Sequence, residues 1–320
     1  MENLKNVTKP ELKPVLDFTI NGWTNPDASE SRAKEDCRRL ESGEILFFPK
    51  APFEFSEEDR LFLLSVRQTA GNHHKNIAYR PQQDKVTGVD DGSADAEQLH
   101  RILGNFSREV IEFLGDYLTP YKGHWDLDYA SFRPLQEQGR QNRTTARNDL
   151  LHVDNFPTRP TNGKRILRIF ININPTENRR WITGETMEVL GPRLAPKANF
   201  KGIVNSARSP LNNALRPVKK ALNGLGIKIV DRSPYDAFMH EFHNFMKLDS
   251  EFQENCAKNY WEFPPASVWM VYTDMVPHAV LSGQYALEQT FLIHDDAMVT
   301  PEKAPVKILE KLAGFSLKYT

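Results

Sequence analysis

The order of apolar and polar positions predicts helices in the first part of the chain. The segment Glu30–Leu40 is compatible with a helix that Gly43 ends, and Ser56 with Asp59 three residues later is typical of a helix start. A longer helix is predicted where apolar residues recur at intervals of three and four, and Pro120 ends it. The apolar residues of that helix are Leu99, Ile102, Leu103, Phe106, Val110, Phe113, Leu114 and Tyr117.

The pattern of residues changes after Trp125. From there on, short apolar segments follow one another, and no helix is predicted between the early ones. These segments are rich in β-branched and aromatic residues and are separated by Gly, Pro or Asn, which is the pattern of strands. Earlier in the chain, only residues 45–48 predict a short buried strand; residues 1–28 predict an extended segment and residues 71–92 a loop. The predicted strands are Leu127–Arg133, Asn148–Val153, Arg165–Ile173, Trp181–Leu190, Val268–Thr273 and Tyr285–Ile293.

Together these elements predict a mainly β protein with flanking helices. Six or more short strands in this order favour an antiparallel sandwich or barrel formed by residues 125–320. Residues 1–124 are expected to form a helical segment that packs on this core, and the whole chain to form one compact domain. Residues 192–265 interrupt the strands and contain a helical stretch at Tyr235–Cys256, so they are expected to form either a substrate lid or a structural cap.

The amino-acid composition of the chain limits the classes of protein to which it can belong. The 320 residues have 39% hydrophobic content and balanced charge, 41 basic against 42 acidic residues, so nothing indicates a nucleic-acid partner. No apolar run approaches the length of a membrane span, and the first residues lack the order of a secretory signal. Two cysteines, Cys37 and Cys256, provide neither a disulfide framework nor a thiolate zinc site. These features predict a cytoplasmic location.

The candidate chemistry is concentrated at His152 and Asp154. Residues two apart on a strand point the same way, so this imidazole and this carboxylate would aim at one point. His278, just after a later predicted strand, is the candidate third ligand. Two imidazoles and one carboxylate on one face of an octahedron leave three positions open, the arrangement of non-haem Fe(II) oxygenases. Taken alone, the His-x-Asp pair could equally be a turn carboxylate beside a hydrogen-bonded histidine.

Several stretches around these residues resemble a known family, the hydroxylases of 3-deoxy-D-manno-octulosonic acid (Kdo). The resemblance extends over roughly residues 30–295 and is more specific than the three-ligand pattern, which a very large superfamily shares. It is carried by Asn148–Gly163, Arg165–Pro175, Trp181–Glu185 and Pro277–His278.

The resemblance implies a fold, an activity and a substrate. Members of the family have a double-stranded β-helix (jelly-roll, cupin-like) core and depend on Fe(II), with 2-oxoglutarate and O2 as cosubstrates. They hydroxylate C3 of Kdo in the lipopolysaccharide inner core, so the implied substrate is an anionic, lipid-linked sugar, Kdo-lipid A. The implied metal ligands and catalytic residues are His152, Asp154 and His278. A lipid substrate also implies peripheral association with the inner membrane.

One departure from the wider superfamily concerns the residue that binds the far carboxylate of 2-oxoglutarate. Many superfamily members place an Arg or Lys about ten residues after the second His, where this chain has Glu288. Arg168 is the first candidate instead, because an Arg fork suits a carboxylate and its strand alternation also places Asn172 on the same face. Arg165 is the second candidate, and Arg168 could alternatively pair with Asp149 or Glu288 for structural reasons.

Local charge supports an anionic substrate. From residue 133 to residue 180 the chain has ten basic residues against four acidic ones, and such a basic region near a metal would attract carboxylates and phosphates. Arg133, Arg143 and Arg147 are therefore the candidate substrate contacts, although residues 137–147 also have the character of a solvated loop.

Three other functions remain open at this point. The same ligands could serve a zinc hydrolase with a water in the fourth position, the barrel could bind a sugar without catalysis, or an oxygenase could act on another small anionic substrate. His240 and His243 are three residues apart, so they lack the spacing of the His-Glu-x-x-His zinc helix, and we interpret them as an exposed helix face.

Overall fold

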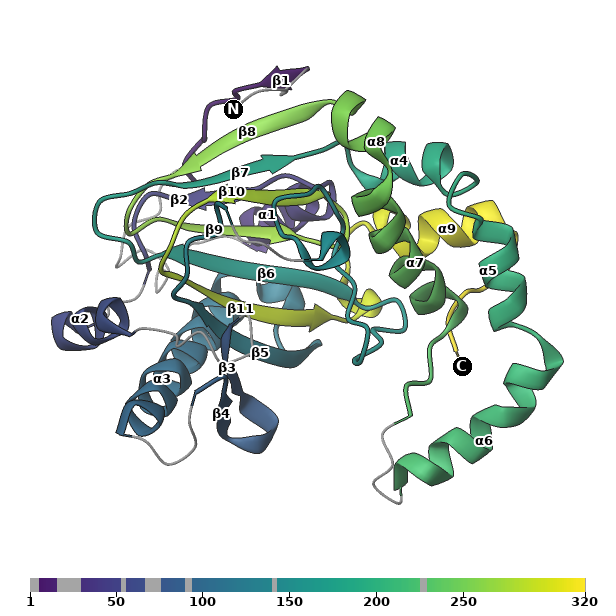
Figure 1. Cartoon of the computed structure of the whole chain (residues 1–320), viewed down its shortest axis with the longest axis horizontal. Coiled ribbons are helices and arrows are strands. Elements are labelled where there is room, and N and C mark those ends of the chain that lie inside the picture. The colour runs from purple at the N-terminus through teal and green to yellow at the C-terminus, as the bar shows by residue number, and fades with distance from the viewer. Residues whose placement is uncertain are drawn as a thin grey trace.

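Two β-sheets packed face to face hold the core in the computed structural model (Figure 1). Aromatic side chains join them: Trp181 of one sheet lies 4.8 Å from Phe170 and 5.5 Å from Trp269 of the other, between ring centroids. The structure describes residues 6–15, 30–52, 56–66, 76–89, 94–139, 143–224 and 229–319. The architecture is the jelly-roll type that the sequence predicts.

The smaller sheet has four strands and the larger has seven. The smaller sheet contains, in spatial order, β1 (Val7–Thr8), β8 (Lys258–Phe263), β7 (Arg179–Thr183) and β10 (His278–Ser282). The larger sheet contains, in spatial order, β2 (Leu46–Phe48), β9 (Val268–Tyr272), β6 (Arg165–Asn172), β11 (Ala286–Ile293), β5 (Trp125–Arg133), β3 (Ile77–Arg80) and β4 (Lys85–Thr87). All pairs in the larger sheet are antiparallel.

The strand β6 lies in the middle of the larger sheet, and this position explains why its residues are mostly apolar. It pairs with β9 on one side and β11 on the other, and all eight of its residues are buried. A strand covered on both faces needs no polar alternation, and the helices α1 (Glu30–Glu41) and α3 (Ala94–Tyr117) supply the outer cover. The apolar residues from which the sequence predicts this helix are all buried in α3, as their spacing along one helix face requires.

The helices predicted in the N-terminal part are present, together with strands. Helix α2 (Glu57–Ser65) starts as the sequence predicts, with the amide of Asp59 donating to the Ser56 hydroxyl at 3.0 Å. The N-terminal part is not only helical, however, because β2, β3 and β4 join the larger sheet. The loop prediction for residues 71–92 is wrong for 77–87, where β3 pairs with β5 and so gains its stability from tertiary contact.

Two of the predicted strands are also wrong in part. Residues 148–153 form no strand; they make one isolated β-bridge, between His152 and His278, and the carbonyl of Asn148 accepts from the amide of Val280. Residues 181–190 are split, since β7 ends at Thr183 and helix α4 (Met187–Leu194) begins directly after Thr186. The strands β8 and β10 were not predicted, because their half-polar sequences only gain order by pairing with β7.

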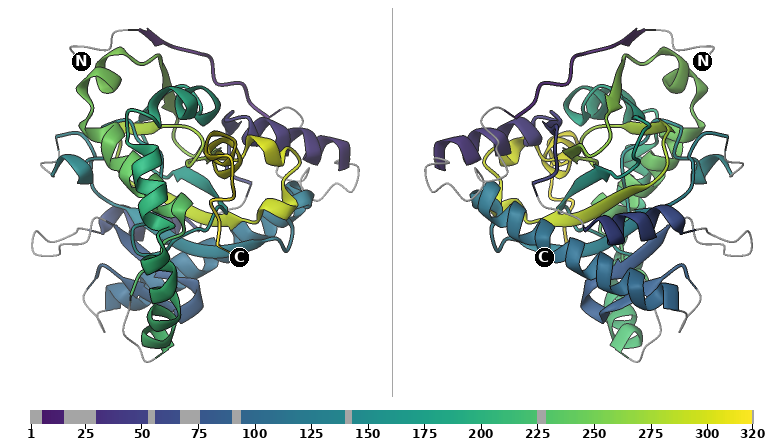
Figure 2. Two further views of the ribbon diagram at one scale, coloured as in Figure 1. Left: turned by 90° about the vertical axis from the view of Figure 1, so that its right-hand side faces the viewer. Right: turned by 90° about the vertical axis from the view of Figure 1, so that its left-hand side faces the viewer.

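The insertion between strands is a group of helices on one side of the barrel (Figures 1 and 2). It contains α5 (Phe200–Ala207), α6 (Pro210–Gly224), α7 (Pro234–Leu248) and α8 (Ser250–Asn255), and the chain then returns to the smaller sheet as β8. The C-terminal helix α9 (Pro305–Ala313) packs against α4. Single turns of 3-10 helix lie at Pro81–Gln83, Thr119–Tyr121, Thr144–Ala146, Asp295–Ala297 and Pro301–Lys303. None of the described helices has both the length and the apolar character needed to cross a membrane.

Candidate metal centre and its cavity

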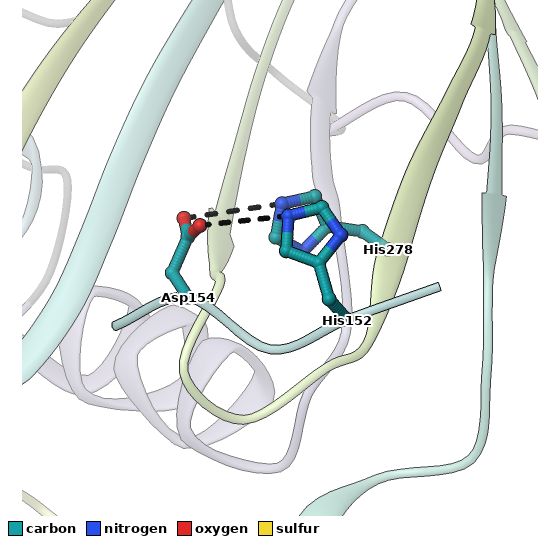
Figure 3. Close-up of side chains that lie close together, drawn as sticks. All are labelled: His152, Asp154 and His278. Atoms are coloured by element: carbon teal, nitrogen blue, oxygen red, sulfur yellow. Dashed lines mark ion pairs between the residues drawn. The ribbon is translucent and has the colours of Figure 1, made fainter. Parts of the chain in front are cut away.

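The three candidate ligands meet at one point inside the barrel (Figure 3). His152 and Asp154 lie on the segment after the 3-10 turn at Thr144–Ala146, and His278 is the first residue of β10. Their ligand atoms all lie within 4.8 Å of one another, and all three residues are buried. Each Nε2 atom of the two histidines is 3.9 Å from a carboxylate oxygen of Asp154. The spatial convergence that the sequence predicts is confirmed.

Backbone hydrogen bonds fix the two chain segments against each other. The amide of His152 donates to the carbonyl of His278 at 3.2 Å, and the amide of His278 donates back at 3.0 Å. Two residues further, the amide of Asp154 donates to the carbonyl of Thr273 at 2.8 Å. The ligand-bearing segment therefore needs no strand of its own, because short backbone contacts to the loop before β10 position both of its side chains.

Further hydrogen bonds orient the imidazole rings. Nδ1 of His152 lies 2.7 Å from the carbonyl of Leu150, and Nδ1 of His278 lies 3.1 Å from that of Val276. Since a carbonyl only accepts hydrogen bonds, each Nδ1 carries the proton and each Nε2 presents its lone pair to the centre. Burial lowers the pKa of both imidazoles, that of His152 well below its usual value, so both rings stay neutral as metal ligands require.

Asp154 is held as a carboxylate. Burial by itself would raise its pKa. The charge of Arg168, whose Nε is 3.0 Å from Asp154 Oδ2, acts together with His278, His152 and a hydrogen bond from Thr273 to outweigh burial, and these groups hold the pKa well below its usual range. The contact with Arg168 lacks hydrogen-bond geometry, and Asp154 Oδ2 is a buried oxygen with no hydrogen-bond partner. Two neutral imidazoles and one such carboxylate fit a divalent transition metal with open coordination positions.

The metal centre opens into a cavity of about 220 Å³. Besides the three ligands, its walls consist of Asn76, Arg133, Thr145, Ala146, Asn148, Arg168, Phe170, Arg179, Trp181, His243, Lys247 and Val280. Three buried or nearly buried arginines and a buried lysine give the cavity a strongly basic wall. Such a wall favours small ligands that carry carboxylates.

Glu288 lies behind this wall and pairs with two of its arginines. Arg133 donates to Glu288 Oε2 at 2.6 and 3.0 Å, and Arg168 donates to the same carboxylate at 3.3 Å. Burial raises the pKa of Glu288, yet Arg133 and Arg168 outweigh it and leave the pKa lowered. The residue at the usual anchor position thus holds two arginines in place, and the structural pairing of Arg168 with Glu288 considered above is present.

Arg179 is a cavity residue that the sequence did not single out. Its side chain is buried, and it donates to the carbonyl of Gly283 at 3.2 Å. Its Nε and Nη2 atoms have no hydrogen-bond partner among the described residues, and burial, with Arg133 nearby, lowers its pKa to about 10. The signal was present in the strand pattern, because Arg179 alternates with Trp181 onto the inner face of β7.

Two of the predicted cosubstrate residues lie away from the cavity. Arg165 is fully buried and donates from Nε to Asp274 at 2.8 Å, with its guanidinium 4.1 Å from the Tyr272 ring centroid. Asn172 donates from its side-chain amide to two backbone carbonyls, both at 2.9 Å. Both side chains therefore stabilise the sheet, and neither belongs to the cavity wall.

Of the three predicted substrate residues, one lines the cavity and two lie outside it. Arg133 lines the cavity, whereas Arg147 pairs with Asp149 at 2.6 and 2.9 Å at the surface and Arg143 is exposed. Neither Arg143 nor Arg147 forms part of the cavity wall. Charge counting along the sequence could not separate these positions, because it carries no information on which side chains turn inward.

Helix α7 adds two residues to the cavity wall: His243, which the sequence analysis placed on an exposed helix face, and Lys247, which it did not single out. His243 is not on an exposed face: its Nδ1 is 2.7 Å from the carbonyl of Val153 and its ring centroid is 4.9 Å from that of His152. Lys247 is buried and donates from Nζ to the carbonyl of Thr145 at 3.1 Å. Their separation of four residues on a predicted helix was the available signal, since it places both on one face.

Comparison with known proteins points to one family. The family model for 3-deoxy-D-manno-oct-2-ulosonic acid (Kdo) hydroxylase matches residues 23–316. A crystal structure of the Kdo hydroxylase KdoO, a non-haem Fe(II) alpha-ketoglutarate-dependent dioxygenase, in complex with succinate and Fe(III) is 33% identical, with a TM-score of 0.79 over 99% of this chain and 98% of that one. KdoO with alpha-ketoglutarate and Fe(III) gives 32% identity and a TM-score of 0.77 over 98% of both chains. No curated protein sequence matches the chain.

Proposed function

The chain belongs to the family of Kdo hydroxylases, and on this premise we propose that it hydroxylates a Kdo sugar as an Fe(II)- and 2-oxoglutarate-dependent dioxygenase. The observation that carries the proposal is the buried group formed by His152, Asp154 and His278. The Nε2 lone pairs of both histidines and a carboxylate oxygen of Asp154 that has no hydrogen-bond partner all point to the same centre. Family membership favours this oxygenase over the zinc hydrolase and the non-catalytic sugar-binding barrel.

These three residues would hold the iron. Iron with 2-oxoglutarate and O2 supplies the oxygen chemistry when bound, and the protein supplies position, dryness and charge. The carbonyls of Leu150 and Val276 keep the imidazoles in the ligating tautomer, and Arg168 keeps Asp154 ionised. The aromatic wall at Trp181, stacked 5.4 Å from His278, excludes water from one side of the centre.

We assign the far carboxylate of 2-oxoglutarate to the basic wall of the cavity. Arg168 remains a proposed contact, and Arg179 joins it because two of its buried nitrogens have no hydrogen-bond partner among the described residues. Arg133 completes the group, with Glu288 balancing part of its charge. A buried guanidinium binds a carboxylate through two parallel hydrogen bonds, which fixes both position and direction.

The sugar would enter from the side of α7. Kdo carries a carboxylate, and Lys247 offers an ammonium group in the cavity wall on the α7 side, with His243 beside the metal ligand His152. We propose that Lys247 binds the sugar carboxylate and that His243 contacts its hydroxyl groups. We propose further that the substrate is Kdo in lipid-linked form, Kdo-lipid A, that C3 is the site hydroxylated, and that the protein works on the cytoplasmic side of the inner membrane.

Product analysis tests this function directly. The protein, loaded with Fe(II) and incubated with 2-oxoglutarate, O2 and Kdo-lipid A, should form succinate and increase the mass of the Kdo moiety by about sixteen units, one oxygen atom. Asp154→Ala should abolish both products, whereas Asp116→Ala, which removes an exposed carboxylate paired with Lys122, should not. An unchanged mass together with oxygen-independent turnover would contradict the proposal.

A further inference from the structure

Helix α6 turns its polar side toward the protein. Asn212 donates from its side-chain amide to the carbonyl of Ser206 at 2.8 Å. One turn further, Arg216 Nε lies 3.4 Å from Asp231, and Lys219 Nζ lies 3.5 Å from the same carboxylate. On this side the helix is therefore held by a hydrogen bond to α5 and by ion pairs to the segment that follows it, which is the reverse of a surface helix packed on a core through its apolar face.

The opposite side of α6 is an apolar stripe that faces solvent. Leu211, Leu215 and Val218 are 69%, 41% and 52% exposed, and their spacing of four and then three residues places them on one face. Leu222, four residues further on, continues the same line and is half-buried. Figures 1 and 2 show α6 at the edge of the molecule, beyond α5 and α7. We call these four residues the α6 stripe.

The chain around the α6 stripe has a charge unlike that of the rest of the protein. Between Glu188 and Asp231 there are eight basic residues and no acidic residue, although the whole chain has 41 basic and 42 acidic residues. Arg208, between α5 and α6, stacks 3.6 Å from the ring centroid of Phe315 and is exposed. Four of the eight basic residues pair with three carboxylates, Arg193 with Glu185, Lys197 with Glu251, and both Arg216 and Lys219 with Asp231, so an excess of positive charge remains. An apolar helical face beside such an excess is complementary to an anionic lipid surface.

We propose that α6 lies in the plane of an anionic membrane surface, with the α6 stripe among the acyl chains and the neighbouring basic residues at the lipid headgroups. The choice of a lipid rather than a second copy of the chain rests on the proposed lipid-linked substrate and on this one-sided charge. Two positively charged copies would repel each other across the same stripe, whereas anionic headgroups would attract them.

The position of α7 connects this surface with the catalytic cavity. His240, Asn244 and Phe245 of α7 line a hollow of about 780 Å³ between α5, α6 and α7. His243 and Lys247, on another face of the same helix, line the cavity of the metal centre. One helix thus separates the membrane-binding element from the catalytic cavity, a short path for a sugar that stays attached to its lipid.

Vesicle binding tests the proposal. The full chain is sedimented with vesicles of phosphatidylcholine alone and with vesicles in which about a third is phosphatidylglycerol, at low and high salt. We expect binding to the anionic vesicles only, weakened by salt. The triple variant Leu211→Gln, Leu215→Gln, Val218→Gln should bind at least about tenfold more weakly. The control variant Leu61→Gln, Val189→Gln, Leu312→Gln removes as many exposed apolar residues from α2, α4 and α9 and should bind like the parent.

Three results would overturn the proposal. These are absence of binding to anionic vesicles, equal binding by the triple variant, and a dimer in sedimentation velocity that the triple variant dissociates, which would make the α6 stripe a contact between copies. Asp154→Ala, which should lack activity, should bind vesicles normally. A protein that binds vesicles without hydroxylating Kdo contradicts only the proposed function, and one that hydroxylates detergent-dispersed substrate without binding vesicles contradicts only this inference.

Discussion

The backbones of His152 and His278 exchange two hydrogen bonds, at 3.2 and 3.0 Å, although the residues lie far apart in the chain. This pairing sets the distance between the two imidazoles, whose centroids are 4.9 Å apart. The carbonyls of Leu150 and Val276 then set the direction of each ring. The protein backbone thus positions the rings for a cation, and the lowered pKa values of the three side chains reduce the competition from protons.

Metal loading should stabilise the protein through this centre. At a metal concentration of about one hundred times the dissociation constant, binding to the folded state adds about 2.7 kcal/mol to the free energy of unfolding. For a chain of this size that raises the Tm by several degrees, which anaerobic thermal denaturation with Fe(II), or with Co(II) as an oxygen-stable probe, would measure. Asp154→Ala should lose the increase and Asp116→Ala should keep it. An equal increase in both variants would place the metal elsewhere.

Glu288→Gln should destabilise the protein strongly. The carboxylate pairs with Arg133 and Arg168, both nearly buried, and its removal leaves two cations without this partner. Loss of one partner of a buried ion pair costs about 3–5 kcal/mol, which urea denaturation would show as a lower midpoint. The matched substitution Glu57→Gln breaks an exposed pair with Arg60 and should change the free energy of unfolding by less than about 1 kcal/mol. Similar effects for both variants would contradict the role assigned to Glu288.

The same carboxyl group should contribute to acid sensitivity. Its pKa is lower in the folded protein than the ordinary value of 4.5, because Arg133 and Arg168 outweigh burial. The unfolded chain therefore binds the proton first, and the stabilisation from Glu288 is fully present above the unfolded pKa and is lost as the pH falls through the folded one. Urea midpoints measured from pH 6 down to pH 3 should fall less steeply for Glu288→Gln than for the parent. A slope that the substitution leaves unchanged would show that other carboxylates dominate.

Arg179→Lys should weaken the binding of 2-oxoglutarate. A lysine keeps the charge but loses the planar fork, so we expect the KM for 2-oxoglutarate to rise at least about tenfold while the KM for the Kdo substrate changes little. Arg180→Lys is the matched control, since Arg180 is the next residue on β7 and pairs with Glu262 at the surface. Rates of succinate formation over a range of 2-oxoglutarate concentrations give both constants. Equal behaviour of the two variants would remove Arg179 from the cosubstrate site.

Lys247→Met should instead affect the sugar. Methionine keeps most of the length of the side chain and removes its charge, so the KM for Kdo-lipid A should rise at least about tenfold. The slow formation of succinate in the absence of sugar should persist, because Lys247 lies on the α7 side of the cavity wall. Lys34→Met, which removes an exposed charge paired with Glu30, serves as the control. A selective rise in the KM for 2-oxoglutarate would assign Lys247 to the cosubstrate.

The three candidate ligands, which the structure brings together, could be selected from the sequence because His-x-Asp and a later His lie within stretches that resemble one family. The strand assignment that supported the pair was nevertheless wrong, since residues 148–153 form no strand. The two side chains converge because backbone hydrogen bonds to Thr273 and His278 position their segment. Those bonds join residues that are distant in sequence, so no local pattern could predict them.

The sequence by itself determined the apolar central strands, the long N-terminal helix and the kinds of ligand available. Burial and helical periodicity can be predicted from the order of apolar and polar residues. The tertiary structure decided which charged side chains enter the cavity. Arg165 and Arg168 lie on the same strand, yet one pairs with Asp274 and the other contacts Asp154. Likewise His243 and Lys247 became cavity residues only when α7 packed beside the metal centre. Inward direction depends on which elements become neighbours, and the long-range contacts that fix this are made only in the folded chain.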